Sequence, residues 1–195
     1  RMGAVIDLED GYVRATAPNG LRGAEIRLPQ PSVGATENLL MAAALARGDS
    51  LIAGAAREPE IVDLAECLVA MGARIEGAGT SNITVQGVAS LHGASHSIIP
   101  DRIEAGTYAM AAAAAGGNVL LEGARFEHLG AMIKFLRDAG VRVDAEGRGL
   151  RVQRAAKDRD RPLGGGEIVV DVEPAHCCLH RVSFDGVPMR RRPCR

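Results

Sequence analysis

Residues 32–38 have the residue types of an anion-binding site at the start of a helix. Ser32 and Thr36 offer hydroxyl groups, and Gly34 lets a ligand approach the backbone closely. The first N–H groups of a helix lack partners within the helix, and the helix dipole places positive charge there. A phosphate or diphosphate suits such a place. The alternative is a plain cap, in which the Ser32 side chain only holds the first turn.

Charged residues stand at two further predicted helix starts. Arg57 and Glu58 precede Pro59, which fits the first turn of a helix. Asp101 and Arg102 stand at the start of a later helix, the one that corresponds to the helix after residues 32–38. An acidic residue there complements the helix dipole without any ligand. The alternative is that Arg57 and Glu58 face a binding site and that Arg102 presents its positive charge to an anionic substrate.

The cysteines and histidines do not form a recognisable metal site. Residues 176–180 read His-Cys-Cys-Leu-His, but the nearest further cysteine is Cys194, in an arginine-rich end. This spacing lacks the second ligand pair of a zinc site. Cys67 falls on the apolar side of a predicted helix, where a buried reduced thiol is expected. We therefore expect no metal and no cofactor.

The elements that position these residues repeat with a period of about seventy residues. We expect one α/β unit over residues 3–71, a second over 72–140, and the start of a third over 141–174. Pro31 and Pro100, which precede the two candidate helix starts, lie sixty-nine positions apart. The chain begins and ends out of phase with this repeat, which indicates a fragment. Residues 175–195 show no periodicity and are expected to be an aberrant tail, disordered or translated out of frame.

Each unit is predicted to run β-β-β-α-β-α. The predicted strands alternate in part and are separated by glycine turns: 5–8, 12–15, 24–28, 50–52, 74–76, 82–85, 96–99, 118–121, 141–143 and 150–153. The apolar runs 39–46 and 109–115 predict helices that are buried on every side. A later helix in each unit is amphipathic and ends at Gly72 or Gly140, where a left-handed residue is favoured. The fold class is therefore α/β, with mixed sheets around buried helices.

Composition limits the function classes. Among 195 residues, 47% are hydrophobic and 3% aromatic, and the net charge is −1. That charge argues against a nucleic-acid surface. No apolar run reaches the roughly 18 residues of a membrane span. Asp7, Glu9 and Asp10 interrupt any signal peptide. We expect a soluble, cytoplasmic protein with neither nucleic acid nor membrane as a partner.

Three segments together carry a family resemblance: residues 32–38, 55–64 and 91–107. They resemble the UDP-N-acetylglucosamine 1-carboxyvinyltransferases, and the likeness extends over about residues 1–172. The resemblance implies two similar domains, each made of three α/β units about a pseudo-threefold axis, an inside-out α/β barrel. It also implies transfer of the enolpyruvyl group of phosphoenolpyruvate to the 3-hydroxyl of UDP-N-acetylglucosamine. Phosphate is released through a tetrahedral adduct, in the first committed step of peptidoglycan synthesis.

The resemblance assigns roles to residues already noted. Ser32, Val33 and Gly34 match residues that hold the UDP portion, and Gln30 stands where many relatives carry lysine. Four charged residues match the face between the family's two domains, in a supporting role: Arg57, Glu58, Asp101 and Arg102.

The resemblance assigns no principal catalytic residue to this chain. The family's reactive cysteine lies in a loop upstream of position 1. Its general-base aspartate follows a Glu-Pro-x-Pro-x-Phe-Pro-Thr-Asp stretch, from which the chain departs after Pro174. We therefore expect no turnover from these 195 residues alone. Two alternatives remain, a fragment of the related 3-phosphoshikimate transferase and a non-catalytic binding module or pseudogene product. Residues 32–38 and 57–64 favour the UDP-sugar enzyme.

Overall fold

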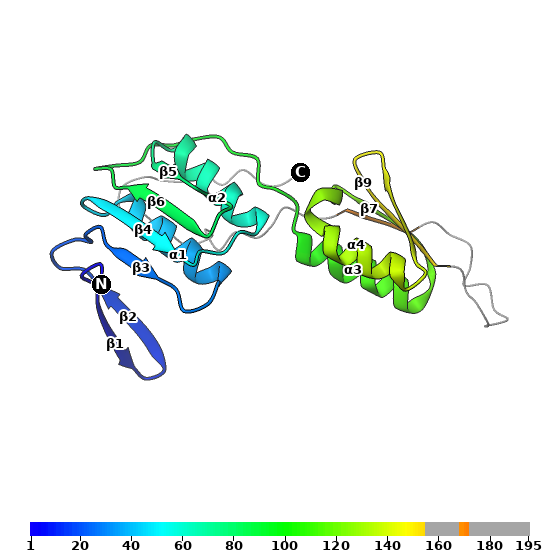
Figure 1. Ribbon diagram of the computed structural model, residues 1–195, viewed down its shortest axis with the longest axis horizontal. Helices are drawn as coiled ribbons and strands as arrows, with labels where there is room; N and C mark the ends of the chain where they lie inside the picture. Colours follow the sequence, from blue (N-terminus) through cyan, green and yellow to red (C-terminus); the bar gives the residue numbers. More distant parts are fainter. Residues whose placement is uncertain (155–167, 172–195) are drawn as a thin grey trace. The chain divides into compact units, whose positions relative to one another are not determined.

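A computed structural model describes residues 1–154 and 168–171 of the chain. The described residues fall into two compact units, unit 1 up to residue 99 and unit 2 from residue 100 onward (Figure 1). The predicted repeats instead meet between residues 71 and 72. The first compact unit extends beyond that point because strands β5 (Arg74–Glu76) and β6 (Asn82–Gln86) complete its sheet.

Unit 1 is built on a mixed four-stranded sheet in the order β3-β4-β6-β5. Strand β3 (Glu25–Arg27) pairs in parallel with β4 (Asp49–Ala53), and the other pairs are antiparallel. Helices α1 (Val33–Ala44) and α2 (Pro59–Ala70) cover one face of this sheet (Figure 1). Leu40, Ile52, Ile61, Ile83 and Val85 form the centre of the core between helices and sheet, each at most 1% exposed.

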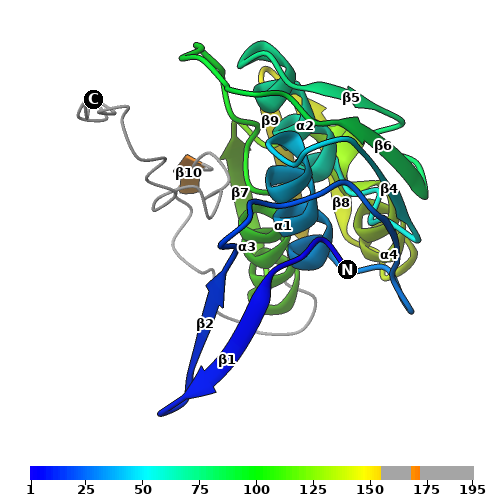
Figure 2. The same cartoon turned by 90° about the vertical axis from the view of Figure 1, so that its left-hand side faces the viewer.

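A separate hairpin precedes this sheet. Strands β1 (Val5–Glu9) and β2 (Tyr12–Thr16) pair only with each other among the described residues. Asp10 and Gly11 both have positive φ, as a tight hairpin turn requires. Figure 2 shows the hairpin projecting from the rest of unit 1. The two predicted strands are thus confirmed.

Unit 2 repeats the plan of unit 1. Its helices are α3 (Arg102–Ala115) and α4 (Gly130–Asp138), the second preceded by a 3-10 turn over Phe126–Leu129. Its strands are β7 (Gly117–Glu122), β8 (Arg142–Glu146), β9 (Gly149–Arg154) and β10 (Ile168–Asp171). The order β10-β7-β9-β8 matches β3-β4-β6-β5, with β10 parallel to β7 as β3 is to β4.

One predicted strand is wrong. Residues 96–99 form no strand, although their sequence favours one. The His96 Nε2 atom lies 3.0 Å from the Asp63 Oδ1 atom of α2, and both side chains are largely buried. The sheet position beside β7 is occupied by β10 instead. Residues 96–99 are therefore attached to α2, and β10, which comes later in the chain, is the strand that pairs with β7.

The predicted burial of the apolar helices is only partly correct. Both helices exist, but each begins at least six residues before its apolar run. Ala105, Ala109, Ala112 and Ala113 of α3 are buried against the sheet of unit 2, whereas Met110 is 43% exposed. Burial on every side is therefore wrong for α3, because the sheet covers one side of it. Within the described ranges, no helix is long and apolar enough to cross a membrane.

Candidate functional site

The loops that follow β3 and β4 leave the sheet of unit 1 at the same edge. This follows from the parallel pairing of the two strands, since the carboxyl ends of parallel neighbours meet at one edge. Residues 28–32 lead from β3 into α1, and residues 54–58 lead from β4 into α2. The positive ends of both helix dipoles therefore lie at this edge.

The start of α1 presents free backbone donors. Ser32 is the N-cap in an extended conformation, and its Oγ accepts a hydrogen bond from the Ala35 amide at 3.4 Å. The Ser32 carbonyl accepts from the Thr36 amide at 3.0 Å. Within the part of the chain that the structure describes, the amides of Val33 and Gly34 have no hydrogen-bond partner. Ser32 is thus a cap, as the simpler interpretation predicts, and two adjacent N–H groups remain for a ligand.

The structure contradicts the prediction that the Thr36 hydroxyl contacts a ligand. The residue is 0% exposed. Its Oγ1 donates to the Ser32 carbonyl at 2.8 Å and accepts from the Ala56 amide at 3.0 Å. The ligand-contacting role is therefore wrong, and Thr36 joins the two loops instead. Its position four residues after the N-cap, on the side of the apolar face, is the sequence signal for burial.

Arg57 and Glu58 lie in the second loop, next to the residue that Thr36 holds. Glu58 is the N-cap of α2, half-buried, and its Oε2 accepts a hydrogen bond from the Arg57 amide at 2.8 Å. The Arg57 residue is exposed, and Gln30 is exposed in the first loop. The structure thus brings Gln30, the α1 start and the Arg57–Glu58 pair to one edge of unit 1.

A pair of carboxylates lies near these helix starts. Glu37 of α1 is partly buried. Burial, and secondly the nearby Glu60 carboxylate at the start of α2, raises the pKa of Glu37 above its ordinary value. Both causes disfavour the ionised form of Glu37. Sequence reasoning missed this pair, because it depends on how α1 packs against α2.

We expect Glu37→Gln to stabilise the protein at neutral pH. Because the pKa of Glu37 is raised on folding, the folded state binds this proton more tightly than the unfolded state. Stability therefore falls as pH rises through the interval between the ordinary and the raised pKa. The stabilisation by Glu37→Gln should disappear below pH 4, as measured by urea unfolding across pH. Glu66→Gln, at an exposed position of α2, controls for the loss of one charge.

Asp101 and Arg102 stand at the corresponding helix start of unit 2. Asp101 is the N-cap of α3, and its Oδ1 accepts from the Ile103 amide at 2.7 Å and the Glu104 amide at 3.2 Å. Ser32 and Asp101 are thus N-caps sixty-nine positions apart. Both Asp101 and Arg102 are half-buried. Capping accounts for the Asp101 carboxylate, as the simpler interpretation predicts.

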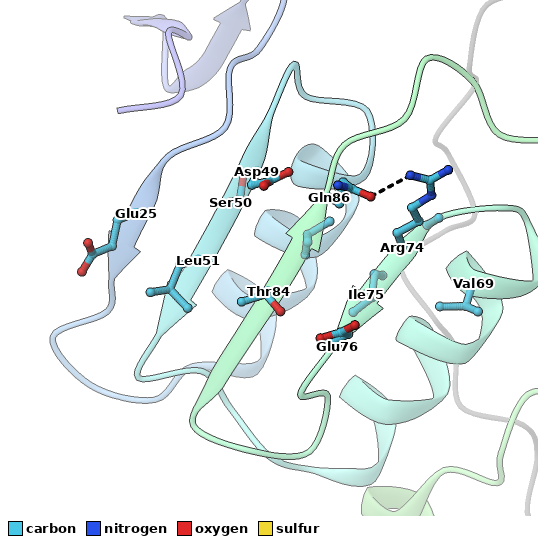
Figure 3. A pocket seen from close by; sticks show the side chains of 12 residues that line it. Glu25, Asp49, Ser50, Leu51, Val69, Arg74, Ile75, Glu76, Thr84 and Gln86 are labelled. Atoms are coloured by element: carbon cyan, nitrogen blue, oxygen red, sulfur yellow. Dashed lines mark hydrogen bonds between the residues drawn. The ribbon is translucent and has the colours of Figure 1, made fainter.

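A depression of about 660 Å³ lies elsewhere on unit 1, and part of its lining is the sheet face opposite the helices (Figure 3). Its lining includes Glu25, Leu51, Thr84 and Glu76, which the strand register places in one row. Across its rim the Arg74 Nη1 atom donates to Gln86 Oε1 at 2.7 Å. None of the predicted site residues lines this depression. It is not the site that the sequence predicts.

The described residues contain no group of three or more His, Cys, Asp or Glu that could hold a metal ion. The predicted thiol Cys67 is free and half-buried on α2. Burial, followed by the Asp63 carboxylate, raises the pKa of Cys67 and disfavours the reactive thiolate. The His-Cys-Cys-Leu-His segment at 176–180 and the predicted tail at 175–195 lie outside the described residues.

Comparison with known sequences gives consistent matches. Residues 1–174 match the family described as EPSP synthase (3-phosphoshikimate 1-carboxyvinyltransferase). The chain is 60% identical over 154 residues to UDP-N-acetylglucosamine 1-carboxyvinyltransferase of Granulibacter bethesdensis, covering 79% of this chain and 37% of that protein. It is 61% identical over 174 residues to the protein of that name from Rhodospirillum centenum, covering 89% and 39%. The chain thus spans less than two fifths of these two relatives.

Comparison with solved structures supports the fold. The enolpyruvyl transferase NikO from Streptomyces tendae matches with a TM-score of 0.64 and 24% identity, covering 80% of this chain and 40% of that one. EPSP synthase from Acinetobacter baumannii matches with a TM-score of 0.51 and 24% identity, covering 77% and 36%. The predicted fold class, α/β with mixed sheets as in enolpyruvyl transferases, is confirmed.

Proposed function

The chain belongs to the EPSP synthase (3-phosphoshikimate 1-carboxyvinyltransferase) family, and from that premise we propose that it is part of an enzyme of peptidoglycan synthesis. That enzyme transfers the enolpyruvyl group of phosphoenolpyruvate to the 3-hydroxyl of UDP-N-acetylglucosamine and releases phosphate. It acts in the cytoplasm. The peptidoglycan that it helps to make supports cell shape and division. The names of the relatives at 55–61% identity support this choice of substrate.

The observation that carries the proposal is the meeting of two helix starts at one edge of unit 1. The Val33 and Gly34 amides, the Ser32 hydroxyl and Gln30 would bind the diphosphate and uridine portion, because unpaired amides at a positive helix end favour anions. Arg57 and Glu58 lie on the adjoining loop and would act in support. In unit 2, Asp101 and Arg102 have the same supporting role. We assign no principal catalytic residue among the described residues.

Calorimetric titration of the 195-residue chain tests the substrate class. We expect UDP-N-acetylglucosamine to bind weakly and shikimate 3-phosphate not to bind. The family description favours shikimate 3-phosphate as the alternative substrate, and binding of that compound alone would support it. If neither compound binds, the proposal is contradicted, and the interpretation that the chain binds no substrate of this family is favoured. We expect no phosphate release from phosphoenolpyruvate and UDP-N-acetylglucosamine, and measured release would overturn the expected inactivity.

Gly34→Ala tests the helix start directly. A Cβ added at Gly34 would meet no atom within 4 Å, so the fold does not need glycine there. Alanine favours a helix over glycine by up to about 1 kcal/mol, so stability should be unchanged or slightly increased. The added methyl group should instead obstruct a diphosphate at the amides. We expect UDP-N-acetylglucosamine to bind about tenfold more weakly or worse, a loss of about 1.4 kcal/mol in calorimetry.

Gly130→Ala is the matched control for this substitution. Gly130 is the first residue of α4, and a Cβ there also meets no atom within 4 Å. The control should leave binding unchanged and affect stability similarly, since it changes a helix start in unit 2. Equal affinities for wild type and Gly34→Ala would show that the ligand does not bind at the start of α1.

A further inference from the structure

We propose that Thr36 is a positioning residue, which holds the loop carrying Arg57 and Glu58 in register with the start of α1. In this arrangement residues of both loops contact the same nucleotide-sugar ligand. The inference rests on the function proposed above, and it assigns a role to a residue that does not touch the ligand. Thr36 is 0% exposed and lies in the first turn of α1.

The Thr36 hydroxyl makes one bond to each loop. Its Oγ1 donates to the Ser32 carbonyl at 2.8 Å and accepts from the Ala56 amide at 3.0 Å. Ser32 directly precedes the Val33 and Gly34 amides, and Ala56 directly precedes Arg57. A single buried hydroxyl thus links the two loops, and in each loop the bonded residue directly precedes a candidate ligand contact.

Other contacts fix the first loop at its base and the second loop as far as Ala55, whose amide donates to the Ser81 carbonyl at 3.0 Å. The Leu28 amide donates to the Ala53 carbonyl at 2.8 Å, and a Cβ on Gly54 would lie 2.9 Å from the Leu28 carbonyl oxygen. These contacts lie next to the ends of β3 and β4. The Thr36 bond lies further along the second loop, one residue before Arg57. It is therefore placed to set the position of Arg57 and Glu58.

Loss of the hydroxyl should move this loop. Valine has nearly the same shape as threonine but cannot accept a hydrogen bond. The Ala56 residue is only 1% exposed, so its amide would be left buried without a partner. Because Ala56 itself is buried, bringing its amide to water requires the backbone at Ala56 to shift, and Arg57, as the next residue, shifts with it. Serine keeps the hydroxyl and should keep the loop in place.

The test compares Thr36→Val with Thr36→Ser in the full 195-residue chain by NMR. Without ligand, the Ala56 amide should be protected from hydrogen exchange in wild type and T36S and exchange much faster in T36V. The backbone resonances of Arg57 and Glu58 should shift in T36V alone. With UDP-N-acetylglucosamine, wild type and T36S should show shifts at both Gly34 and Arg57. In T36V the Arg57 response should be lost and the dissociation constant should rise about tenfold.

The outcomes separate the two proposals. If T36V leaves the Ala56 protection and the Arg57 and Glu58 resonances unchanged, the positioning role is overturned whether or not any ligand binds. If UDP-N-acetylglucosamine shifts no resonance in wild type, the proposed function fails, and the shared-ligand role of Thr36 fails with it. Rescue by T36S, but not by T36V, supports positioning over simple filling of space.

A variant that fails to fold does not remove the test. If T36V gives no dispersed spectrum, Thr36→Ala is measured in the same way, since alanine also lacks the hydroxyl group. A loop that keeps wild-type resonances in T36A overturns the proposal. Fast exchange at Ala56 with displaced Arg57 resonances supports it.

Discussion

Gly87→Ala is expected to destabilise unit 1 severely. Gly87 directly follows β6, and a Cβ there would overlap the carbonyl oxygen of Ala46, two residues after the end of α1. The same Cβ would lie 2.8 Å from the Ala46 carbonyl carbon and 3.1 Å from the Gly48 carbonyl oxygen. All three atoms belong to the backbone, so no side-chain rotation can relieve the overlap.

The backbone cannot move away without losing bonds that join the segment after β6 to the end of α1 and to the turn that follows it. The Gly87 amide donates to the Gly48 carbonyl at 3.2 Å, and the Val88 amide donates to the Ala44 carbonyl at 2.9 Å. We therefore expect a loss of about 3 kcal/mol or more, the size associated with severe overpacking. Urea unfolding by circular dichroism, with hydrogen exchange at the buried Ile83 of β6, would measure it.

Gly93→Ala is the control for this substitution. Gly93 lies in the segment after β6, and a Cβ there meets no atom within 4 Å. Its effect should stay within about 0.5 kcal/mol. A Gly87→Ala protein that unfolds at the wild-type urea concentration would show that the turn after α1 can move aside without cost.

Most elements of the fold could be predicted from local sequence. Alternating residues between glycine turns predicted β6, and Gly72 and Gly140 have the positive φ expected after their helices. The strand predicted over 96–99 failed for a non-local reason. Its β propensity is real, but the edge beside β7 is filled by β10, and His96 is held by Asp63. The β propensity of a segment does not show which of two segments forms the edge strand of a sheet.

The site could be predicted only in part. Cap residues and proline predicted where α1 and α2 begin, because these signals are local. The meeting of the two starts depends on the parallel pairing of β3 with β4, which no single segment encodes. The sequence likewise could not tell that the Thr36 hydroxyl is used internally. A hydroxyl near a helix start suits a phosphate and a buried loop amide equally well, and only packing distinguishes them.

Leu136→Ala is expected to destabilise unit 2 strongly. Leu136 of α4 is 1% exposed and belongs to the core cluster of that unit, together with Ile133, Leu121 and Val143. Removing three carbon atoms there loses their burial and leaves a cavity that a packed core closes incompletely. Such substitutions cost about 2–5 kcal/mol. Urea unfolding followed by circular dichroism measures the loss.

Phe135→Ala is the matched control, because it changes the adjacent residue of the same helix. Phe135 has the larger apolar side chain, yet it is 61% exposed, since it lies off the stripe that faces the sheet. Its loss should cost less than about 1 kcal/mol. Hydrophobicity alone would rank the two substitutions in the opposite order, so the pair tests the register of α4. A cost for Phe135→Ala equal to that of Leu136→Ala would mean that something covers this face of α4.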